Sequence, residues 1–279
     1  MAIVFNKLLI PVDFTTNTDL AIKKAIGLVE ADRTVLHLLH VVYPHRPIEA
    51  LAAQNQLEEL GYRISETRPD LAIKTHILKG YSVQRMIIEC ARMLMPDLII
   101  IGKQHNRRNW TIFPPRNWFF SRNISPDLLA QRTNYPVLTA KPGSDDGRTR
   151  IIVIPIRNFL PERKLEWAIV LARKYRAQIH LLAMQSHYQG EGLPQAFLKA
   201  YHFLREHLQH PIEFATVAGH DLARATLKYA EEVMADLILV NPTTESEIKS
   251  FKGSKHISDL LGKDSKIQVL DVEPLKNQI

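Results

Sequence analysis

Short runs of apolar residues alternate along the chain with longer segments in which apolar residues recur every three to four positions. The first pattern is typical of buried strands and the second of amphipathic helices. Strands are predicted at 7–12, 34–42, 73–78, 98–102 and 137–140, and again at 150–156, 178–184, 212–217, 237–240 and 266–272. Strands that alternate with helices of ten or more residues indicate right-handed crossovers and a parallel sheet covered on both faces. The expected fold class is therefore α/β.

The second half of the chain repeats the first. A shift of 139 residues aligns Gly80 with Gly219, Ser82 with Asp221, Ala91 with Ala230 and Asp97 with Asp236. Ser82 and Asp221 each follow a glycine turn and are expected to cap the next helix. Between the copies, segment 141–150 is polar and rich in turn residues, as expected of a linker. The sequence predicts two domains, 1–143 and 144–279.

Composition adds little to this picture but excludes several classes of protein. The 279 residues are 46% hydrophobic, which suits two ordinary globular cores. The longest apolar runs, such as 98–101 and 151–156, are far shorter than the roughly 18 residues of a membrane-spanning helix. The single cysteine, Cys90, has no partner for an internal disulfide, and no secretory leader is evident in the first 25 residues, so a cytoplasmic location is expected. The formal charge of +7 favours acidic partners only weakly.

Ordered sequence blocks narrow the fold further. They are IPVDFT at 10–15, LHLLHVV at 36–42, a helix from Gly80 to Ala91, PDLIIIG at 96–102 and NYPVLTA at 134–140. In this order the blocks resemble a domain of the universal stress protein (UspA-like) family, and the chain as a whole resembles a tandem two-domain member. The resemblance implies two doubly wound five-stranded parallel sheets of the adenine-nucleotide alpha-hydrolase-like, Rossmann-like kind, packed as an internal pseudo-dimer. It also implies a stress-response protein that dimerises and has no catalytic residues.

Some members of that family bind ATP through a G-x2-G-x9-G-[ST] loop after the fourth strand, where glycines let the backbone approach phosphate. In the first half Gly102 matches the first glycine, but His105 stands at the second and the final pair falls on Asn123 and Ile124. Asp13 matches an aspartate that the family uses near the base or ribose. The resemblance therefore gives these candidate nucleotide contacts in the first half: Pro11, Val12, Asp13, Val41, Gly102, His105 and Asn123.

The second half has lost different parts of the same loop. Asn241 and Thr244 replace the first two glycines, while Gly253 and Ser254 resemble the final pair. Arg157 or Asn158 stands in place of the aspartate. Gly253 and Ser254 are therefore the candidate contacts of this half. Since neither half carries an intact phosphate loop, no cofactor is required by the sequence, and ATP is the candidate for any residual binding.

Several of these candidates have a purely structural alternative. Asp13 is equally well explained as a cap of the following helix, whose start is expected at Thr15 or Thr18. Gly102 is better explained by a turn after the strand. Gly253 and Ser254 equally fit the entry to a helix, because serine at an N-cap has the same sequence signature.

The segment 105–123 combines arginine with aromatic residues and contains no acidic residue. Its candidate partner-binding residues are Arg107, Arg108, Trp110, Arg116, Trp118 and Phe119. Tryptophan and arginine are common anchors of protein interfaces, so packing against the other half or another chain is the favoured role. Stacking and phosphate pairing with nucleic acid, and a lid over the crevice, are the alternatives.

The sequence gives little support for metal binding or for catalysis by a nucleophilic side chain. The twelve histidines show no HExxH or CxxC spacing of a metal site, and His37 and His180 occupy equivalent strand positions that suggest packing. No G-x-S-x-G elbow is present, and Cys90 is expected to be an inert core thiol.

The leading hypothesis is a non-enzymatic regulatory protein that acts through dimerisation and an unidentified protein partner. The alternatives are an ATP-binding switch or slow ATPase, and a nucleic-acid binder acting through 105–123.

Overall fold

The computed structural model describes residues 5–29, 34–45, 47–103, 124–142, 148–184, 194–217, 221–250, 253–261 and 265–274. Residues 4–145 and 146–279 form two compact units, which are described separately below.

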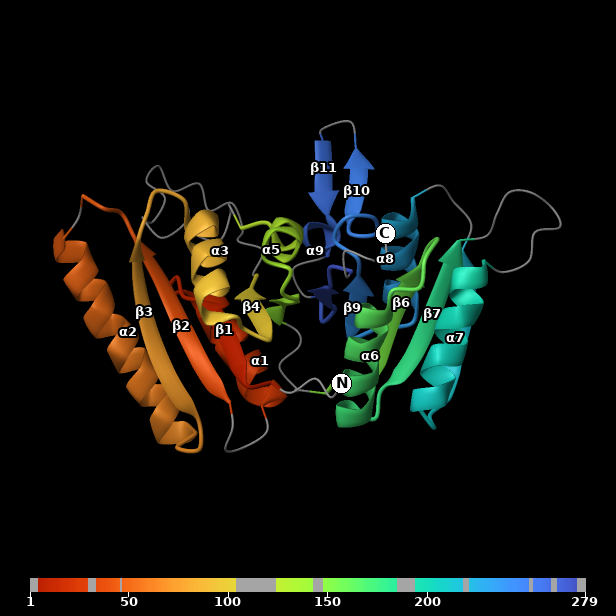
Figure 1. The fold of residues 1–279 in the computed structure, drawn as a ribbon, viewed down its shortest axis with the longest axis horizontal. Helices are drawn as coiled ribbons and strands as arrows, with labels where there is room; N and C mark the ends of the chain where they lie inside the picture. Colours follow the sequence, from red (N-terminus) through yellow and green to blue (C-terminus); the bar gives the residue numbers. More distant parts are fainter. Residues whose placement is uncertain are drawn as a thin grey trace. The chain divides into compact units, whose positions relative to one another are not determined.

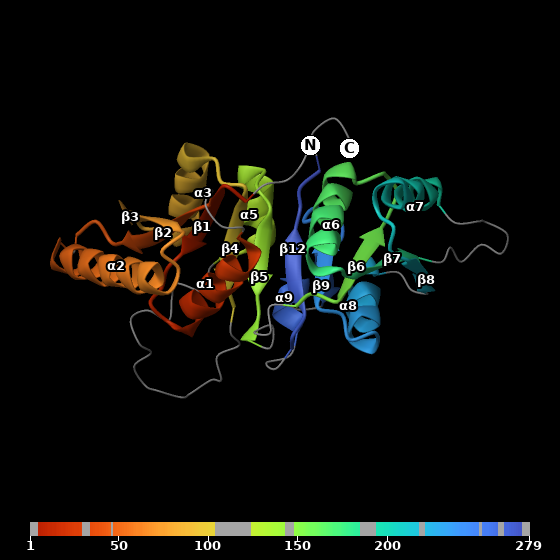
Figure 2. The same ribbon diagram turned by 90° about the horizontal axis from the view of Figure 1, so that it is seen from below.

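The first unit is a parallel α/β domain. Its elements are β1 (Lys7–Pro11), α1 (Thr16–Leu28), β2 (Val35–Val42), α2 (Pro47–Thr67), β3 (Ala72–Lys79), α3 (Val83–Leu94), β4 (Leu98–Gly102), α5 (Pro126–Thr133) and β5 (Val137–Ala140). The strands pair in the order β3-β2-β1-β4-β5, all in parallel. Helices α1 and α2 cover one face of this sheet, and α3 and α5 cover the other (Figures 1 and 2). The strand order reverses between β1 and β4, so the crevice of the domain lies at their carboxyl ends.

The second unit repeats this topology. It comprises β6 (Ile151–Ile156), α6 (Glu162–Tyr175), β7 (Gln178–Met184), α7 (Gln195–His207), β8 (Ile212–Val217), α8 (Leu222–Glu232), β9 (Leu237–Val240), β10 (Glu247–Ser250), β11 (Gly253–His256), α9 (Ile257–Leu260) and β12 (Gln268–Asp271). The parallel sheet has the order β12-β9-β6-β7-β8. Its crevice accordingly lies between the ends of β6 and β9.

The predicted fold class and all the predicted strands are confirmed, with ends that differ by two residues at most. One element was not predicted, an antiparallel hairpin of β10 and β11 that precedes the short helix α9. The hairpin strands are only four residues long and mostly polar, so they lack the apolar run that marks the other strands. The predicted packing of the halves as an internal pseudo-dimer stays a prediction.

Equivalent aspartates hold the amino end of the central strand in each unit. Asp97 Oδ2 accepts hydrogen bonds from the backbone N–H groups of Asn6 and Lys7, each at 2.8 Å. Asp236 Oδ2 accepts from the N–H groups of Arg150 and Ile151 at 2.7 and 3.1 Å. The repeat seen in the sequence therefore preserves a structural contact at the edge of the sheet opposite the crevice.

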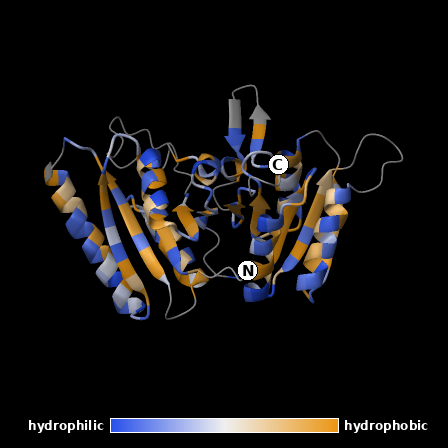
Figure 3. Ribbon diagram, viewed as in Figure 1, coloured by the Kyte–Doolittle hydropathy of each residue, from blue (hydrophilic) through white to orange (hydrophobic). Residues whose placement is uncertain are grey.

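The helix caps and the core also follow the sequence prediction. Ser82 accepts from Arg85 N at 3.3 Å and Asp221 accepts from Arg224 N at 3.0 Å, so both predicted N-caps are confirmed. The central strands are mainly hydrophobic, while the helices expose hydrophilic residues (Figure 3). Cys90 is buried among Ile87, Ile99 and other apolar side chains of the first core, and burial raises the pKa of its thiol to about 11. The cysteine is thus a core residue, as expected.

The equivalent strand histidines His37 and His180 both pack against neighbouring polar rings. His37 Nδ1 lies 2.9 Å from Nε2 of His76 on β3, and the two rings stack with centroids 5.1 Å apart. His180 Nδ1 lies 2.9 Å from the hydroxyl of Tyr229 on α8. The expected packing role is borne out, although the partner differs between the halves.

The contact between His37 and His76 is expected to make the protein less stable in acid. Burial, followed by the charges of His76, Lys74 and Lys7, lowers the pKa of His37 to about 4. The unfolded chain takes up this proton near pH 6.5. The contribution of neutral His37 to the free energy of unfolding is therefore complete above pH 6.5 and is lost as the pH falls towards 4. The free energy of unfolding, measured in urea between pH 7.5 and 4, should depend less on pH for His37→Leu than for the wild type. His202→Leu, at an exposed position on α7, is the control and should keep the wild-type slope.

Candidate functional site

A small open pocket lies at the crevice of the first domain. It is lined by Pro11, Val12, Asp13, Asn17, Ile101, Gly102 and Ile124. Three of the sequence candidates, Pro11, Val12 and Asp13, meet Gly102 here as a result of the parallel topology.

Asp13 organises the turn that leads into α1. Its Oδ1 accepts from the backbone N–H and the hydroxyl of Thr15, at 3.0 and 2.7 Å, and from the hydroxyl of Thr18 at 2.8 Å. Its Oδ2 accepts from the Asn17 side-chain amide at 3.1 Å. Thr15 is the N-cap of α1, which is one of the two starts expected from the sequence. The capping alternative for Asp13 is therefore wrong, because Thr15 caps the helix and Asp13 holds the turn before it. Its contact with a ligand stays a prediction.

Gly102 is required by close packing. A Cβ atom at this position would lie 1.7 Å from the carbonyl oxygen of Asn17 in the first turn of α1. The glycine ends β4 and lets α1 approach the strand end. The alternative given above, a turn after the strand, is therefore incomplete, because the reason for glycine is a contact with a residue far away in the sequence.

The wall of the pocket on the β2 side is held by His40. Its Nδ1–H donates to the carbonyl oxygen of Val12 at 2.7 Å, and its ring lies 4.6 Å from that of Phe14, centroid to centroid. Phe14 has a left-handed backbone with φ of 55°, so the turn after β1 depends on these contacts. Burial lowers the pKa of His40, which favours the neutral ring. Val41, a sequence candidate on the next residue, is part of the buried core, and its contact with a ligand stays a prediction.

The remaining candidates of the first half fall on the segment after β4. His105 and Asn123 lie outside the described residues, as do the proposed partner-binding residues Arg107, Arg108, Trp110, Arg116, Trp118 and Phe119. Ile124, which stands at the [ST] position of the family loop, presents an apolar side chain to the pocket. The described pocket therefore lacks the hydroxyl that this position would supply.

The equivalent crevice of the second domain is filled by a buried ion pair. Lys164 Nζ lies 2.5 Å from Glu245 Oε2, and both side chains are 1% exposed. Lys164 also donates to the carbonyl oxygen of Pro155 at the end of β6, at 2.6 Å, and Glu245 accepts from Asn241 N at 2.7 Å. Burial lowers the pKa of Lys164 and raises that of Glu245, and the attraction between the two groups opposes both shifts. Polar side chains of the protein itself thus satisfy the strand ends where a ligand would lie.

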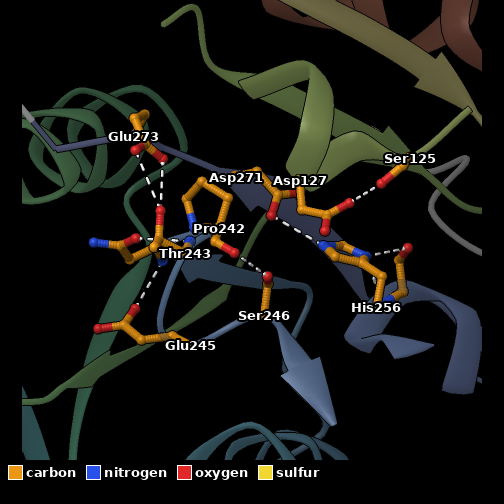
Figure 4. A network of polar contacts seen from close by, with 11 residues as sticks. Ser125, Asp127, Pro242, Thr243, Glu245, Ser246, His256, Asp271 and Glu273 are labelled. Carbon is orange, nitrogen blue, oxygen red and sulfur yellow. Dashed lines mark hydrogen bonds and ion pairs between the residues drawn. The ribbon is translucent and has the colours of Figure 1, made fainter. Parts of the chain in front are cut away.

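Further internal contacts surround this pair. Arg157, one of the two residues that could stand in place of the aspartate of the first half, donates from Nη1 to the carbonyl oxygen of Thr244 at 3.2 Å. Thr243 donates from its hydroxyl to Glu273, as Figure 4 shows beside Pro242 and Glu245. The loop after β9 is therefore tied to the ends of its neighbouring strands.

Sequence reasoning missed both Lys164 and Glu245. They are 81 residues apart, and each alone resembles a solvated charge on a helix or loop. The repeat offered one signal, since Lys164 stands four residues before the buried Ala168 just as Asn17 stands four residues before the buried Ala21. A lysine in the place of an inward-facing asparagine indicates a buried charge that needs a carboxylate partner.

Gly253 and Ser254 lie in a strand and not at the entry to a helix. They pair with Ser250 and Lys249 in the β10–β11 hairpin, and α9 begins four residues after Gly253 with His256 as its N-cap. The helix-entry alternative is therefore wrong, because the chain continues as a strand and the capping acceptor is the ring of His256. The role of both residues as nucleotide contacts stays a prediction.

A buried serine–histidine–aspartate chain follows this hairpin. His256 Nδ1 lies 2.6 Å from the hydroxyl of Ser258 and accepts from Ser258 N at 3.2 Å, while Nε2 lies 2.9 Å from Asp271 Oδ1 (Figure 4). These contacts indicate an Nε2–H tautomer that donates to the carboxylate. Ser258 is 0% exposed. The arrangement ties α9 to β12 and does not present a nucleophile to substrate.

Within the described ranges, no group of three or more histidine, cysteine, aspartate or glutamate side chains is placed to hold a metal ion. None of the helices in these ranges has the length and apolar character needed to cross a bilayer.

These features define a doubly wound α/β protein with a crevice pocket in the first half. Residues 5–111 match the model of the universal stress protein family. The first half of the chain is therefore similar to a universal stress protein domain, as its sequence blocks indicated. The comparison with curated proteins gave no match.

Solved structures share the fold over nearly the whole chain. A universal stress protein from Archaeoglobus fulgidus DSM 4304 is 15% identical, with 99% of each chain covered and a TM-score of 0.62. A functionally unknown protein from Pseudomonas aeruginosa PAO1 is 17% identical, with 98% of this chain and 94% of the other covered and a TM-score of 0.59. The cytoplasmic domain of a prokaryotic cation chloride cotransporter is 13% identical, covering 96% and 95%, with a TM-score of 0.58. At these identities the likeness extends to the fold alone.

Proposed function

We propose that this chain is a non-enzymatic regulatory protein of the stress-response type, in which the first domain alone takes an adenine nucleotide. The observation that carries the proposal is the contrast between the two crevices. The first has an open pocket lined by Asp13 and Gly102, while the second is filled by Lys164 and Glu245. The expected cytoplasmic location, the homodimer and the protein partner belong to the same proposal.

Weak binding is expected from the chemistry of the pocket. Asp13 Oδ2 accepts one hydrogen bond from Asn17 and keeps capacity for a donor of a ligand, such as a ribose hydroxyl or an adenine amino group. Ile124 and Ile101 supply apolar contact but no phosphate ligand. The pocket thus suits a sugar or a base better than a triphosphate group, and nothing in its described residues activates a water molecule for hydrolysis.

Calorimetric titration with ATP tests this proposal. Ile124→Trp fills the pocket and should weaken ATP binding at least tenfold, or about 1.4 kcal/mol. Leu128→Trp, at a partly exposed position of α5, is the matched control and should bind as the wild type does. Phosphate release in the presence of ATP should stay at the rate of buffer alone.

Three outcomes would contradict the proposal. Absence of ATP binding by the wild type would remove the nucleotide, and equal binding by Ile124→Trp would place the ligand elsewhere. Sustained phosphate release that is lost in Ile124→Trp would instead support the slow ATPase.

A further inference from the structure

Each of the three loops that follow β1, β2 and β3 carries an aromatic residue. Phe14 follows β1, Tyr43 and His45 follow β2, and Tyr81 follows β3. Because the strands are parallel, all three loops lie at the carboxyl edge of the sheet, which also holds the pocket. The edge is therefore aromatic over the strands that lie beyond the pocket.

Tyr81 is more exposed than Tyr43 in this row. It is 68% exposed, and Tyr43 is 44% exposed. The Tyr81 hydroxyl is hydrogen-bonded to Nε2 of His45, and the two ring centroids lie 5.9 Å apart at 51°. Gly80 N donates to the carbonyl oxygen of Val42 at 3.0 Å, which keeps Tyr81 beside the end of β2. The side chain is thus oriented by a partner while much of its ring stays accessible.

The polar groups along the same edge follow in a definite order. From β3 to β4 the edge presents Tyr81, then the Tyr43 and His45 loop, then Asp13 after β1, and finally Lys103 after β4. Adjacent strands are about 4.8 Å apart, so the row spans roughly 14 Å over its three spacings. An aromatic surface, a hydrogen-bond acceptor and a cation in this order match a base, a ribose and a phosphate.

We propose that Tyr81, oriented by His45, is the stacking surface for the base of an adenine nucleotide, with the ribose at Asp13 and the phosphates directed towards Lys103. This inference rests on the proposed function and assigns the part of the ligand that the pocket itself does not hold. Stacking on an aromatic side chain stabilises a bound base without any hydrogen-bond readout, because every base has a π-face. A ligand that lacks the aromatic base gains nothing from Tyr81.

The test compares three tyrosine variants by calorimetric titration. Tyr81→Ala should weaken ATP binding about fivefold or more, and Tyr81→Phe should bind within about twofold of the wild type because the ring is retained. Tyr62→Ala removes a tyrosine of similar exposure, 66%, from α2 and should leave the affinity unchanged. Ribose 5-phosphate should bind the wild type and Tyr81→Ala equally. Because Tyr81 is exposed, all variants should fold, which circular dichroism verifies.

A spectroscopic signature separates stacking from indirect effects. In proton NMR the adenine H2 and H8 resonances of ATP should move upfield on binding to the wild type and Tyr81→Phe, and this movement should be lost in Tyr81→Ala. ATP binding that is unchanged in Tyr81→Ala would overturn the inference and leave the proposed function standing. Equal weakening in Tyr62→Ala would also overturn it. A wild type that binds no ATP would overturn both.

Discussion

Replacing Lys164 by methionine is expected to destabilise the second domain by about 3–5 kcal/mol, because the substitution leaves Glu245 buried without its counter-charge. The carboxylate would keep the hydrogen bond from Asn241 N but lose the one from Lys164. Urea unfolding at pH 7, followed by circular dichroism, measures the effect. The first domain should unfold as in the wild type, since both partners belong to the second unit.

The double variant Lys164→Met/Glu245→Gln is the decisive control. The glutamine amide is neutral and its carbonyl oxygen still accepts from Asn241 N, so most of the lost stability should return. If Lys164→Met costs less than about 1 kcal/mol, the pair is solvated and does not fill the crevice. If the double variant is no more stable than the single one, the charge of Glu245 is not the cause.

Gly102→Ala is expected to destabilise the first domain by about 3 kcal/mol, at the upper end of the cost of overpacking. The added Cβ would meet the backbone of Asn17 at 1.7 Å, and no flexible side chain is available to yield. Relief requires the first turn of α1 to move away from β4. Thermal and urea unfolding measure the loss.

Gly27→Ala provides a matched control in the helix that Gly102 contacts. A Cβ at Gly27 would meet no atom within 4 Å, and alanine is favoured over glycine inside a helix. This variant should be more stable than the wild type by up to about 1 kcal/mol. A Gly102→Ala variant that is as stable as the wild type would show that α1 packs less closely on the strand end than the structure indicates.

The sequence predicted the features that depend on local pattern. The strands follow from their apolar runs, and the caps at Ser82 and Asp221 follow from the glycine turns before them. Asp97 and Asp236 were found as a repeated pair, although their role in holding the central strands needed the structure. Family resemblance correctly brought Asp13 and Gly102 to one crevice.

Features that depend on contacts between distant segments were not predicted. The need for glycine at position 102 arises from Asn17, and the burial of Lys164 arises from Glu245. Neither contact produces a periodic pattern in the sequence, because each involves a single pair of residues. The β10–β11 hairpin was missed for a related reason, since its short polar strands lack an apolar run, and only Ile248 among the described residues of β10 is buried.

The hydrogen bonds of Asp97 and Asp236 affect which parts of each half tolerate sequence change. Both secure the amino-terminal edge of their sheet through backbone N–H groups, so they place no demand on the neighbouring side chains. The opposite edge has diverged freely between the halves, with an open pocket in one and an ion pair in the other. New recognition loops could therefore be grafted at the carboxyl ends of the strands in each half. The aspartates at the amino ends would keep the sheet in place.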